Sequence, residues 1–514
     1  MAVHYAEQLR RNARRRPSAL AVVDHGLEST YSELDQKVDN LAGSLVDLGV
    51  AHGDRIALIV DNGGVPLEVM LACCRVGAVY VPLDFRLSAW DAGAILADAD
   101  PVAVVFDDPY RDIVDEVRPS LPGVIAWVST AEEVDSLMVS YRDLITRPTA
   151  QATMPAVIDA DLFCILYTSG TTGRAKGVTF THSQAYDNAV AVVFACGLGP
   201  DSRYLVSYPH NSAGTVNHVW GPTLVTGGCI VLGSVKDFNA PAYFTLVQDY
   251  RVTHSQIVPT MLFRLLDFDG RENYDFSSLQ SIGYASAPIP GNRVRQAIEA
   301  FGPVLSQMYG MTETCSLAAQ LSKDDHLRAA NGEKHLMMSC GRAVSGVELQ
   351  IVDEDGQEVP QGTVGEIAMR GRWMTSGYWR DLERTAETIE KGWLRSGDMA
   401  RMDEEDFIYI VDRKKDLIIT GAAKVASTEV ETALYAHPAV QLAAVIGVPD
   451  PEWGERVHGV VVLHPDRLVS AEDLIAFCRE KLSRYKCPKS VDIVDALPYT
   501  STGKIAKAEL RASY

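Results

Sequence analysis

The sequence predicts an α/β fold in two domains, and three features of the chain lead to this prediction. Short apolar segments typical of buried strands alternate with amphipathic helical segments as far as about residue 310. From residue 348 the helical segments give way to short strands separated by turns rich in Asp and Gly. A new alternation of helices and strands follows the charged segment 412–416. A chain of 514 residues is also long enough for more than one domain.

The first region is expected to form parallel sheets covered by helices on both faces. Its first clear helix has Leu34 and Val38 on one face, and Ser32 followed by Asp35 resembles a capping pair. Gly49 is expected to end this helix. A strand, a helix and two further strands are predicted next, at residues 55–60, 66–75, 78–83 and 102–106.

The second region is expected to form a small barrel-like antiparallel module that closes the large domain. Its strands are predicted at residues 348–352, 365–370 and 407–411. The last region is expected to be a small α+β domain, with helices at 428–435 and 471–482 and strands at 440–448 and 457–463. We therefore predict a large domain over residues 1–411, a linker over 412–415 and a small domain over 416–514.

The composition is that of a globular protein with a large core, and it excludes several functional classes. Apolar residues make up 47% of the chain and charged residues 22%. The formal net charge of −20 argues against general binding to nucleic acid or to an anionic membrane, although local positive groups can still bind ATP. Nine cysteines without a C-x-x-C pair argue for a reducing compartment, so a cytoplasmic location is expected. No apolar run approaches the length of a membrane span.

One segment has the composition of a phosphate-binding loop, and a buried strand is predicted just before it, at residues 162–166. Glycines at 170, 173 and 177 permit positive φ and a close approach of the backbone to a ligand. Successive N–H groups in such a loop form an anion nest, and Lys176 adds a positive charge. A polar surface loop is the alternative. The loop is not an ordinary P-loop, because Lys176 follows Ala175 and no Ser or Thr follows it. A P-loop kinase or ATPase is therefore disfavoured.

The same segment resembles the phosphate loop, Y-T-S-G-T-T-G-x-x-K-G, of the AMP-forming adenylating superfamily. This superfamily includes acyl-CoA synthetases, peptide-synthetase adenylation domains and luciferases. The resemblance extends from about residue 20 to about residue 510, and its motifs occur in the expected order. It implies a small C-terminal domain that moves against the large one. It also implies phosphate contacts from Thr168, Ser169, Gly170, Thr171, Thr172, Gly173 and Lys176.

A second motif, beginning at Tyr309, suits a metal and a purine. A carboxylate beside a hydroxyl and a glycine favours Mg²⁺, and a tyrosine offers a flat face to a base, although a plain strand-end turn is the alternative. The motif resembles the Y-G-x-T-E motif of the family. The resemblance implies that Tyr309 packs on adenine beside Gly310 and Met311, that Thr312 contacts the α-phosphate, and that Glu313 holds Mg²⁺ together with Thr168. A turn containing Ser286, Ala287 and Pro288 resembles the family's small-residue turn beside the adenine and acyl pockets.

Three later segments also match family motifs. Asp398 and Arg413 stand where the family contacts the ribose hydroxyls, and Lys415 stands at the family's hinge. Lys504 matches the mobile catalytic lysine of the P-x-T-x-x-G-K motif. The chemistry explains why a cation is needed, because attack of a carboxylate on the α-phosphorus brings two anions together.

The acid pocket is expected to begin at His210, where the family often has an aromatic residue or a histidine beside the substrate carboxylate. A buried core histidine is the alternative. The resemblance also implies pocket positions at Gly310 and at Asn211, Val216, Tyr284, Ala285 and Ser316. These residues mix polar, apolar and small groups, which favours an aromatic or medium-sized acid over a long chain.

The loop after the hinge departs from the family pattern. Ala422, Lys424 and Ser427 stand where the family usually has glycine, asparagine and proline, and a Cβ at residue 422 would narrow the family's pantetheine tunnel. The resemblance implies adenylation with release of pyrophosphate and then transfer to CoA. Transfer to a carrier-protein thiol, an amine or nitrite remains an alternative, as does a catalytically silent nucleotide-binding homologue. Either a monomer or a homodimer is compatible with the sequence.

Overall fold

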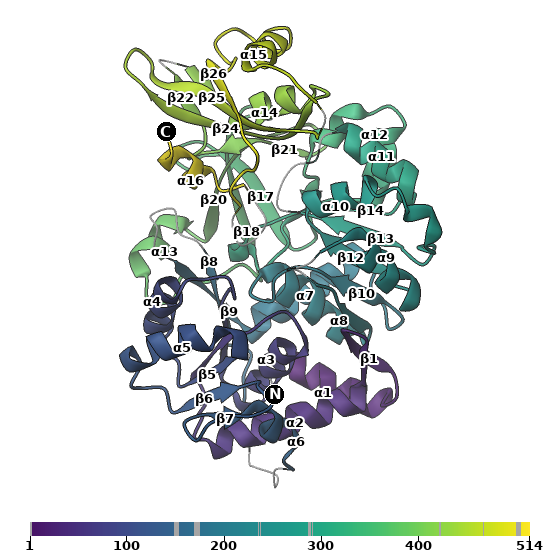
Figure 1. The fold of residues 1–514 in the computed structure, drawn as a ribbon, viewed down its shortest axis with the longest axis vertical. Coiled ribbons are helices and arrows are strands. Elements are labelled where there is room, and N and C mark those ends of the chain that lie inside the picture. Colours follow the sequence, from purple (N-terminus) through teal and green to yellow (C-terminus); the bar gives the residue numbers. More distant parts are fainter. Residues whose placement is uncertain are drawn as a thin grey trace.

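The computed structural model describes residues 3–148, 154–168, 175–234, 236, 238–285, 289, 291–420, 423–465, 467–499 and 505–514. Figure 1 shows a large body with the N-terminal helices at one end and the small C-terminal domain at the other. Within the described segments, no helix is both long and apolar enough to cross a membrane. The predicted α/β fold, with its antiparallel module and separate C-terminal domain, is confirmed.

A seven-stranded sheet carries the strand that leads into the predicted phosphate loop. All neighbouring pairs are parallel except β8 and β9, which are antiparallel and flank the loop. Its strands, in spatial order, are β7 (Val139–Ser140), β6 (Ala126–Ser129), β5 (Ala103–Phe106), β3 (Arg55–Ile59), β4 (Val79–Pro82), β8 (Leu162–Thr168) and β9 (Lys176–Thr181).

A nine-stranded sheet carries the predicted metal and purine motif at the end of β14. Its six central strands are parallel, and antiparallel strands stand at both edges. Its strands, in spatial order, are β16 (Arg342–Ala343), β15 (Ala319–Leu321), β14 (Leu305–Tyr309), β13 (Ser281–Tyr284), β12 (His254–Ile257), β10 (Arg203–Val206), β11 (Cys229–Leu232), β1 (Leu20–Asp24) and β2 (Leu27–Thr30).

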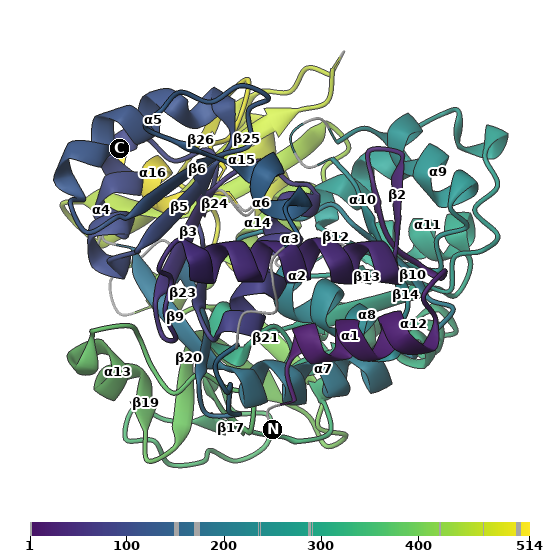
Figure 2. The same ribbon diagram turned by 90° about the horizontal axis from the view of Figure 1, so that it is seen from below.

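Helices fill the space between the two sheets and cover their outer faces. Side chains from both sheets share one apolar core with the inner helices, and Figure 2 shows two of these, α1 and α2, side by side. The inner helices are α1 (Tyr5–Arg15), α2 (Tyr31–Asp47), α3 (Gly64–Val76), α6 (Tyr141–Thr146), α7 (His182–Cys196), the π-helix η3 (Gly214–Trp220) and α8 (Gly221–Thr226). The outer helices are α4 (Ala89–Ala99) and α5 (Arg111–Val117) on the seven-stranded sheet, and α9 (Ala240–Asp249), α10 (Pro259–Leu266) and α11 (Gly291–Phe301) on the nine-stranded sheet.

The start of α2 corrects one prediction. Thr30 caps this helix, and Ser32 does not. The Thr30 hydroxyl accepts a hydrogen bond from the Glu33 N–H, and the Glu33 carboxylate accepts one from the Thr30 N–H at 2.8 Å. The sequence has the spacing of a capping box twice, because Ser32 and Asp35 repeat the chemistry of Thr30 and Glu33 two residues later, inside the first turn.

The antiparallel module is a five-stranded sheet packed against the end of the nine-stranded sheet. Its apolar face shares a core with Tyr309 and Ala318. Its strands are β17 (Val347–Val352), β18 (Gly365–Gly371), β20 (Trp393–Met402), β19 (Ile389–Glu390) and β21 (Ile408–Arg413), with α13 (Leu382–Thr388) beside them. Short 3-10 helices occur elsewhere in the large body, at η1 (Asp108–Tyr110), η2 (Arg118–Ser120), η4 (Arg271–Asn273), η5 (Thr312–Thr314) and η6 (Lys334–Met338).

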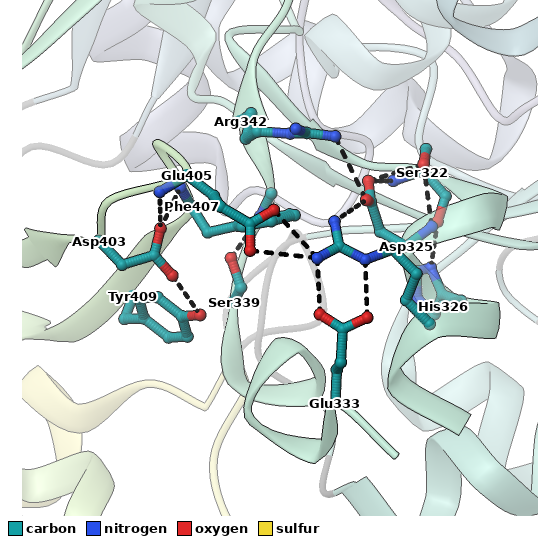
Figure 3. A network of polar contacts seen from close by, with 12 residues as sticks. Ser322, Asp325, His326, Glu333, Ser339, Arg342, Asp403, Glu405, Phe407 and Tyr409 are labelled. Carbon is teal, nitrogen blue, oxygen red and sulfur yellow. Dashed lines mark hydrogen bonds and ion pairs between the residues drawn. The ribbon is translucent and has the colours of Figure 1, made fainter. Parts of the chain in front are cut away.

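A polar network fastens this antiparallel sheet to α12 (Lys323–Ala330), as Figure 3 shows. The Arg328 guanidinium donates to Glu405 in the turn between β20 and β21, at 3.0 Å. Arg342 donates to Asp325 at 3.3 Å and lies over the ring of Phe407, 4.5 Å from its centroid. The network therefore holds the β20–β21 hairpin in a fixed position relative to the nine-stranded sheet.

The C-terminal domain has its own five-stranded sheet and its own apolar cores on the two faces. Its strands are β23 (Ala423–Val425), β22 (Ile418–Thr420), β25 (Gly454–Leu463), β24 (Val440–Asp450) and β26 (Ser490–Ile493), and its helices are α14 (Ser427–Tyr435), α15 (Ala471–Arg479) and α16 (Lys507–Ala512). The chain leaves the antiparallel sheet at Arg413 and enters this domain at Ile418. Of the predicted linker at 412–415, Asp412 and Arg413 still belong to β21, so the passage itself consists of residues 414–417. Its action as a hinge stays a prediction.

Candidate functional site

The carboxyl ends of β8 and β14 bring the predicted phosphate and metal motifs to one place. Ligands of α/β sheets commonly bind at this edge. Lys176 begins β9, and Gly177 after it does not adopt positive φ, contrary to the prediction from its sequence. Gly177 is needed for space instead, because a Cβ there would lie 2.6 Å from Ile165 Cγ2.

Three side chains form what we call the phosphate-side cluster: Lys176, Glu313 and Tyr378. Lys176 Nζ lies 2.5 Å from Glu313 Oε1 and 3.0 Å from the Tyr378 hydroxyl. The Tyr378 hydroxyl donates to the same Glu313 oxygen at 2.8 Å. Burial lowers the pKa of Lys176, but the Glu313 charge and the two hydrogen bonds outweigh it and raise that pKa overall. The lysine therefore stays charged beside the carboxylate.

Tyr378 is a site residue that the sequence reasoning missed. It lies in the connection between β18 and α13, which has neither helical nor strand periodicity. The Tyr378 N–H donates to Thr385 Oγ1 at 2.9 Å. Tyr378 is not part of a named strand, and an isolated β-bridge joins it to Val178 of β9. The one local signal is Gly377, whose φ of 145° and close approach to Thr385 no other residue would tolerate.

A second group, the ribose-side cluster, consists of Tyr309, Asp398 and Arg413. The Tyr309 hydroxyl donates to Asp398 Oδ2 at 2.8 Å. Asp398 and Arg413 stand opposite each other on β20 and β21, and Arg413 Nε lies 3.4 Å from Asp398 Oδ1. The three residues are thus brought together from three strands, and their contacts with a ribose stay predictions.

The carboxylate of Glu313 and the hydroxyl of Thr168, which pairs with Lys176 across β8 and β9, are oxygen groups that fit a magnesium ion shared with a phosphate. The Glu313 side chain is only 4% exposed, and the buried Thr168 hydroxyl has no hydrogen-bond partner among the described residues. In the part of the chain that the structure describes, no group of three or more His, Cys, Asp or Glu residues is placed to hold a metal alone. Mg²⁺ commonly takes one or two carboxylates and completes its shell with phosphate and water, which suits this sparse donor set.

The turn that carries Glu313 has a compact conformation, which its neighbouring residues determine. Thr312 begins the 3-10 helix η5, and the Met311 N–H donates to Thr314 Oγ1 at 3.0 Å. A Cβ at Gly310 would lie 2.3 Å from the Ser316 carbonyl oxygen, so only glycine fits there. The motif therefore folds back on itself and leads from Glu313 directly to Ser316.

His210 is completely buried, and its Nε2 lies 2.8 Å from the Val60 carbonyl oxygen at the end of β3. Burial lowers the pKa of His210 to about 4, so the imidazole is neutral at pH 7. Its Nδ1 and the Oδ1 of the adjacent Asn211 are buried without a hydrogen-bond partner among the described residues. These two unpaired atoms fit a polar ligand group, and the role of His210 beside a carboxylate stays a prediction.

The other predicted pocket residues differ in accessibility. Val216 is fully buried in η3, while Ala285 and Ser316 are partly exposed. Tyr284 is buried, and its hydroxyl is 2.9 Å from His326 Nε2 and 3.2 Å from Gln307 Oε1, so this hydroxyl is directed towards α12.

Several predicted site residues lie outside the described residues, and their roles stay predictions. They are Ser169, Gly170, Thr171, Thr172, Gly173, Ser286, Ala287, Pro288 and Lys504, together with Ala422 and the side chain of Lys424 in the loop after the linker.

One departure from the family pattern has a structural consequence next to the linker. Ser427 is the first residue of α14, and its N–H donates to the buried carboxylate of Asp412. Proline, the family residue at this position, has no N–H to donate. The Ser427 hydroxyl accepts from Lys507 Nζ at 2.7 Å, and Lys507 also pairs with Glu431 at 2.7 Å. Lys415, the predicted hinge residue, lies on the exposed side of this junction.

Comparison with known proteins places the chain in a family. The family model described as AMP-binding enzyme matches residues 9–379, and the model of the AMP-binding enzyme C-terminal domain matches residues 429–504. A feruloyl-CoA synthase of Amycolatopsis sp is 36% identical over 504 residues, covering 98% of each chain. An indoleacetate–CoA ligase of Aromatoleum aromaticum is 32% identical over 507 residues, covering 98% of this chain and 97% of the ligase.

Solved structures agree with this assignment. The structure of the amide bond synthetase McbA from Marinactinospora thermotolerans superimposes with a TM-score of 0.89 at 31% identity, covering 99% of each chain. Sequence motifs, fold and relatives all lead to the same assignment. The chain belongs to the AMP-binding enzyme family, the AMP-forming adenylating superfamily, and is an enzyme of the acyl-CoA synthetase type.

Proposed function

We propose that this enzyme activates a carboxylic acid with ATP and then transfers the acyl group to the thiol of CoA. In the first step a carboxylate oxygen attacks the α-phosphorus of ATP, the bond to the β-phosphate oxygen breaks, and pyrophosphate leaves. In the second step the CoA sulfur attacks the acyl carbon, AMP leaves, and a thioester forms. The observation that carries this proposal is the meeting of Lys176, Glu313, Tyr309 and Asp398 at the carboxyl ends of β8 and β14.

The residues divide the work of the first step between them. Lys176 neutralises phosphate charge, and Asp398 with Arg413 orients the ribose. Glu313, with Thr168, would hold Mg²⁺, which neutralises charge on the phosphates when bound. Lys504 supplies the cation that stabilises the negative charge developing at the α-phosphate.

An amine is the second candidate acceptor. Two observations favour it: the similarity over 99% of each chain to an amide bond synthetase, and the replacement of the family's glycine and asparagine by Ala422 and Lys424. CoA remains the first candidate, because the relatives that cover 98% of this chain at 36% and 32% identity are a feruloyl-CoA synthase and an indoleacetate–CoA ligase.

The test measures pyrophosphate release over a panel of aryl and short aliphatic acids, with CoA, with a primary amine, or with neither. The proposal predicts acid-dependent release of pyrophosphate and a thioester in the presence of CoA. Formation of an amide but no thioester would transfer the assignment to the second candidate. Hydrolysis of ATP that is independent of every acid, or that yields ADP, would contradict both.

A further inference from the structure

A chain of buried polar groups ends at Ser316, next to the predicted acid pocket. Asn188 of α7 is fully buried, and its Nδ2 donates to the Asn217 carbonyl oxygen at 2.7 Å. This bond fixes the orientation of the Asn188 amide, so its Oδ1 is directed at Ser316. The Ser316 hydroxyl therefore donates its proton to Asn188 Oδ1, at 3.1 Å.

His218 contacts Ser316 from the π-helix η3. Its Nδ1 lies 3.5 Å from Ser316 Oγ and its Nε2 lies 3.8 Å from Cys196 Sγ. Burial alone lowers the pKa of His218 to about 4, and burial raises the pKa of Cys196 to about 12, so both groups are neutral at pH 7. Because Ser316 gives its proton to Asn188, a hydrogen bond with His218 requires the imidazole proton to be on Nδ1. The Cys196 thiol then donates to Nε2.

These assignments leave the Ser316 oxygen with a free lone pair. Its own proton is used by Asn188, one lone pair faces His218, and no other described group bonds to it. Ser316 is partly exposed, whereas Asn188 and His218 are buried, so the accessible end of the chain is a hydrogen-bond acceptor. A free hydroxyl would both donate and accept, but this one can only accept.

The surroundings also indicate a site for a polar ligand group. The side-chain amide of Asn217, on the same π-helix, is fully buried and has no partner among the described residues. A seven-residue π-helix is rare, and such helices are frequent at functional sites. Ser316 directly follows the motif of Glu313, and its carbonyl closes against Gly310. The resemblance assigns Thr312 to the α-phosphate and Ser316 to the acid pocket, so an acid whose carboxylate attacks the α-phosphorus is expected to have its distal end at Ser316.

We propose that the acid carries a hydrogen-bond donor, a hydroxyl or an amino group, at the end away from its carboxylate, and that Ser316 Oγ accepts this bond. This inference rests on the proposed function and specifies its substrate class. Asn188 and His218 are positioning residues, because they act only through Ser316. A second carboxylate at the distal end is disfavoured, since it has no proton to give to an oxygen that only accepts.

The test uses non-hydrolysable sulfamoyl-adenosine analogues of the acyl-adenylate, in pairs that differ at one position. The pairs are the 4-hydroxy and 4-fluoro forms of phenylacetic acid and of 3-phenylpropenoic acid, because fluorine has nearly the size of a hydroxyl but cannot donate. Calorimetry gives the Kd of each analogue for the wild type and for Ser316→Ala. The control variant is Ser278→Ala, whose hydroxyl bonds to the Val252 carbonyl oxygen.

We expect the wild type to bind the hydroxy form of at least one pair about tenfold more tightly, which is roughly the value of one hydrogen bond. In Ser316→Ala the ratio should fall to about one, and in Ser278→Ala it should stay as in the wild type. In Asn188→Leu the Ser316 hydroxyl is released to donate as well as to accept, so the ratio should stay near that of the wild type, whereas an analogue with a distal carboxylate, which the wild type disfavours, should bind more tightly. A melting temperature near that of the wild type would show that each variant is folded.

Equal binding of both members in both pairs by the wild type would overturn this inference, and so would a preference that survives in Ser316→Ala. Both of those results would leave the proposed function standing, because the analogues still bind. Failure of every analogue to bind, together with no acid-dependent pyrophosphate release, would instead overturn the proposed function and this inference with it.

Discussion

The two clusters of the nucleotide site are built differently. In the phosphate-side cluster, Lys176 Nζ lies 2.5 Å from Glu313 Oε1, and the two side chains are 21% and 4% exposed. In the ribose-side cluster, Arg413 Nε lies 3.4 Å from Asp398 Oδ1, and the two side chains are 48% and 13% exposed. A buried carboxylate that loses its partner is costly, whereas an exposed pair contributes little. The phosphate side is therefore a closed pair that an incoming ligand has to rearrange, and the ribose side is open to a ligand as it stands.

The largest effect is expected at the closed pair. Glu313→Gln removes the carboxylate that fits Mg²⁺ and leaves Lys176 without its charged partner, so ATP–pyrophosphate exchange should fall by about 10²-fold or more. The matched control is Glu68→Gln, another buried glutamate, which pairs with Lys37 at 3.3 Å. Exchange within a few-fold of the wild type would show that the closed pair is structural only.

A smaller effect is expected on the open side, and it should affect binding. Asp398→Asn weakens two predicted hydrogen bonds to the ribose, so KM for ATP should rise about tenfold while kcat changes less. Arg413→Gln should raise KM less than Asp398→Asn does, because Arg413 is half exposed. Steady-state kinetics with varied ATP distinguishes the two variants. A loss confined to kcat would mean that the two sides of the site do not divide binding and chemistry in this way.

Tyr378→Phe tests whether a single hydroxyl keeps the closed pair together. The variant loses the bonds to both Lys176 and Glu313, so the Mg²⁺ concentration for half-maximal ATP binding should change about three- to tenfold. Binding of AMP without Mg²⁺ should stay as in the wild type. Tyr141→Phe removes a comparable bond, 2.6 Å long, to Glu68 and should leave both measurements unchanged. An equal change in AMP binding would indicate that Tyr378 supports the fold and not the pair.

The last expected effect is on stability and not on activity. It depends on pH and should arise outside both clusters. Burial lowers the pKa of His210, His218 and His254 to about 4 from 6.5. The unfolded chain therefore binds more protons between these two values, and stability is lost as the pH falls from 6.5 to about 4. Urea denaturation at pH 7.5 and pH 5 should show this loss, and His254→Gln should reduce it. If the Glu313→Gln variant lost much less stability than the wild type between pH 7.5 and pH 5, the pH effect would originate in the closed pair and not in the histidines.

Much of the fold could be predicted from the sequence, because periodicity and turn chemistry are local. The strands at β3, β5 and β24 and the helix α14 lie within two residues of their predicted positions. The assignment of the strands of the first region to one sheet or the other was not predicted. Parallel strands look alike in sequence, and only tertiary packing decides which strand pairs with which. The antiparallel partners β9 and β15 were missed for the same reason.

The same distinction between local and distant contacts decides which site residues could be predicted. Lys176, Glu313, Asp398 and Arg413 could be identified because they lie in short motifs with known chemistry. Tyr378, Asn188 and His218 could not, because each depends on a contact with a residue far away in the chain. Such contacts leave no pattern in a single sequence.

The most direct test of the central claim is identification of the nucleotide product from the purified enzyme, ATP and a panel of acids, by chromatography or phosphorus NMR. The account predicts AMP and pyrophosphate in equal amounts, only when an acid is present, and a strong loss of both in Lys504→Ala. Formation of ADP and phosphate, or of AMP at the same rate without any acid, would contradict it.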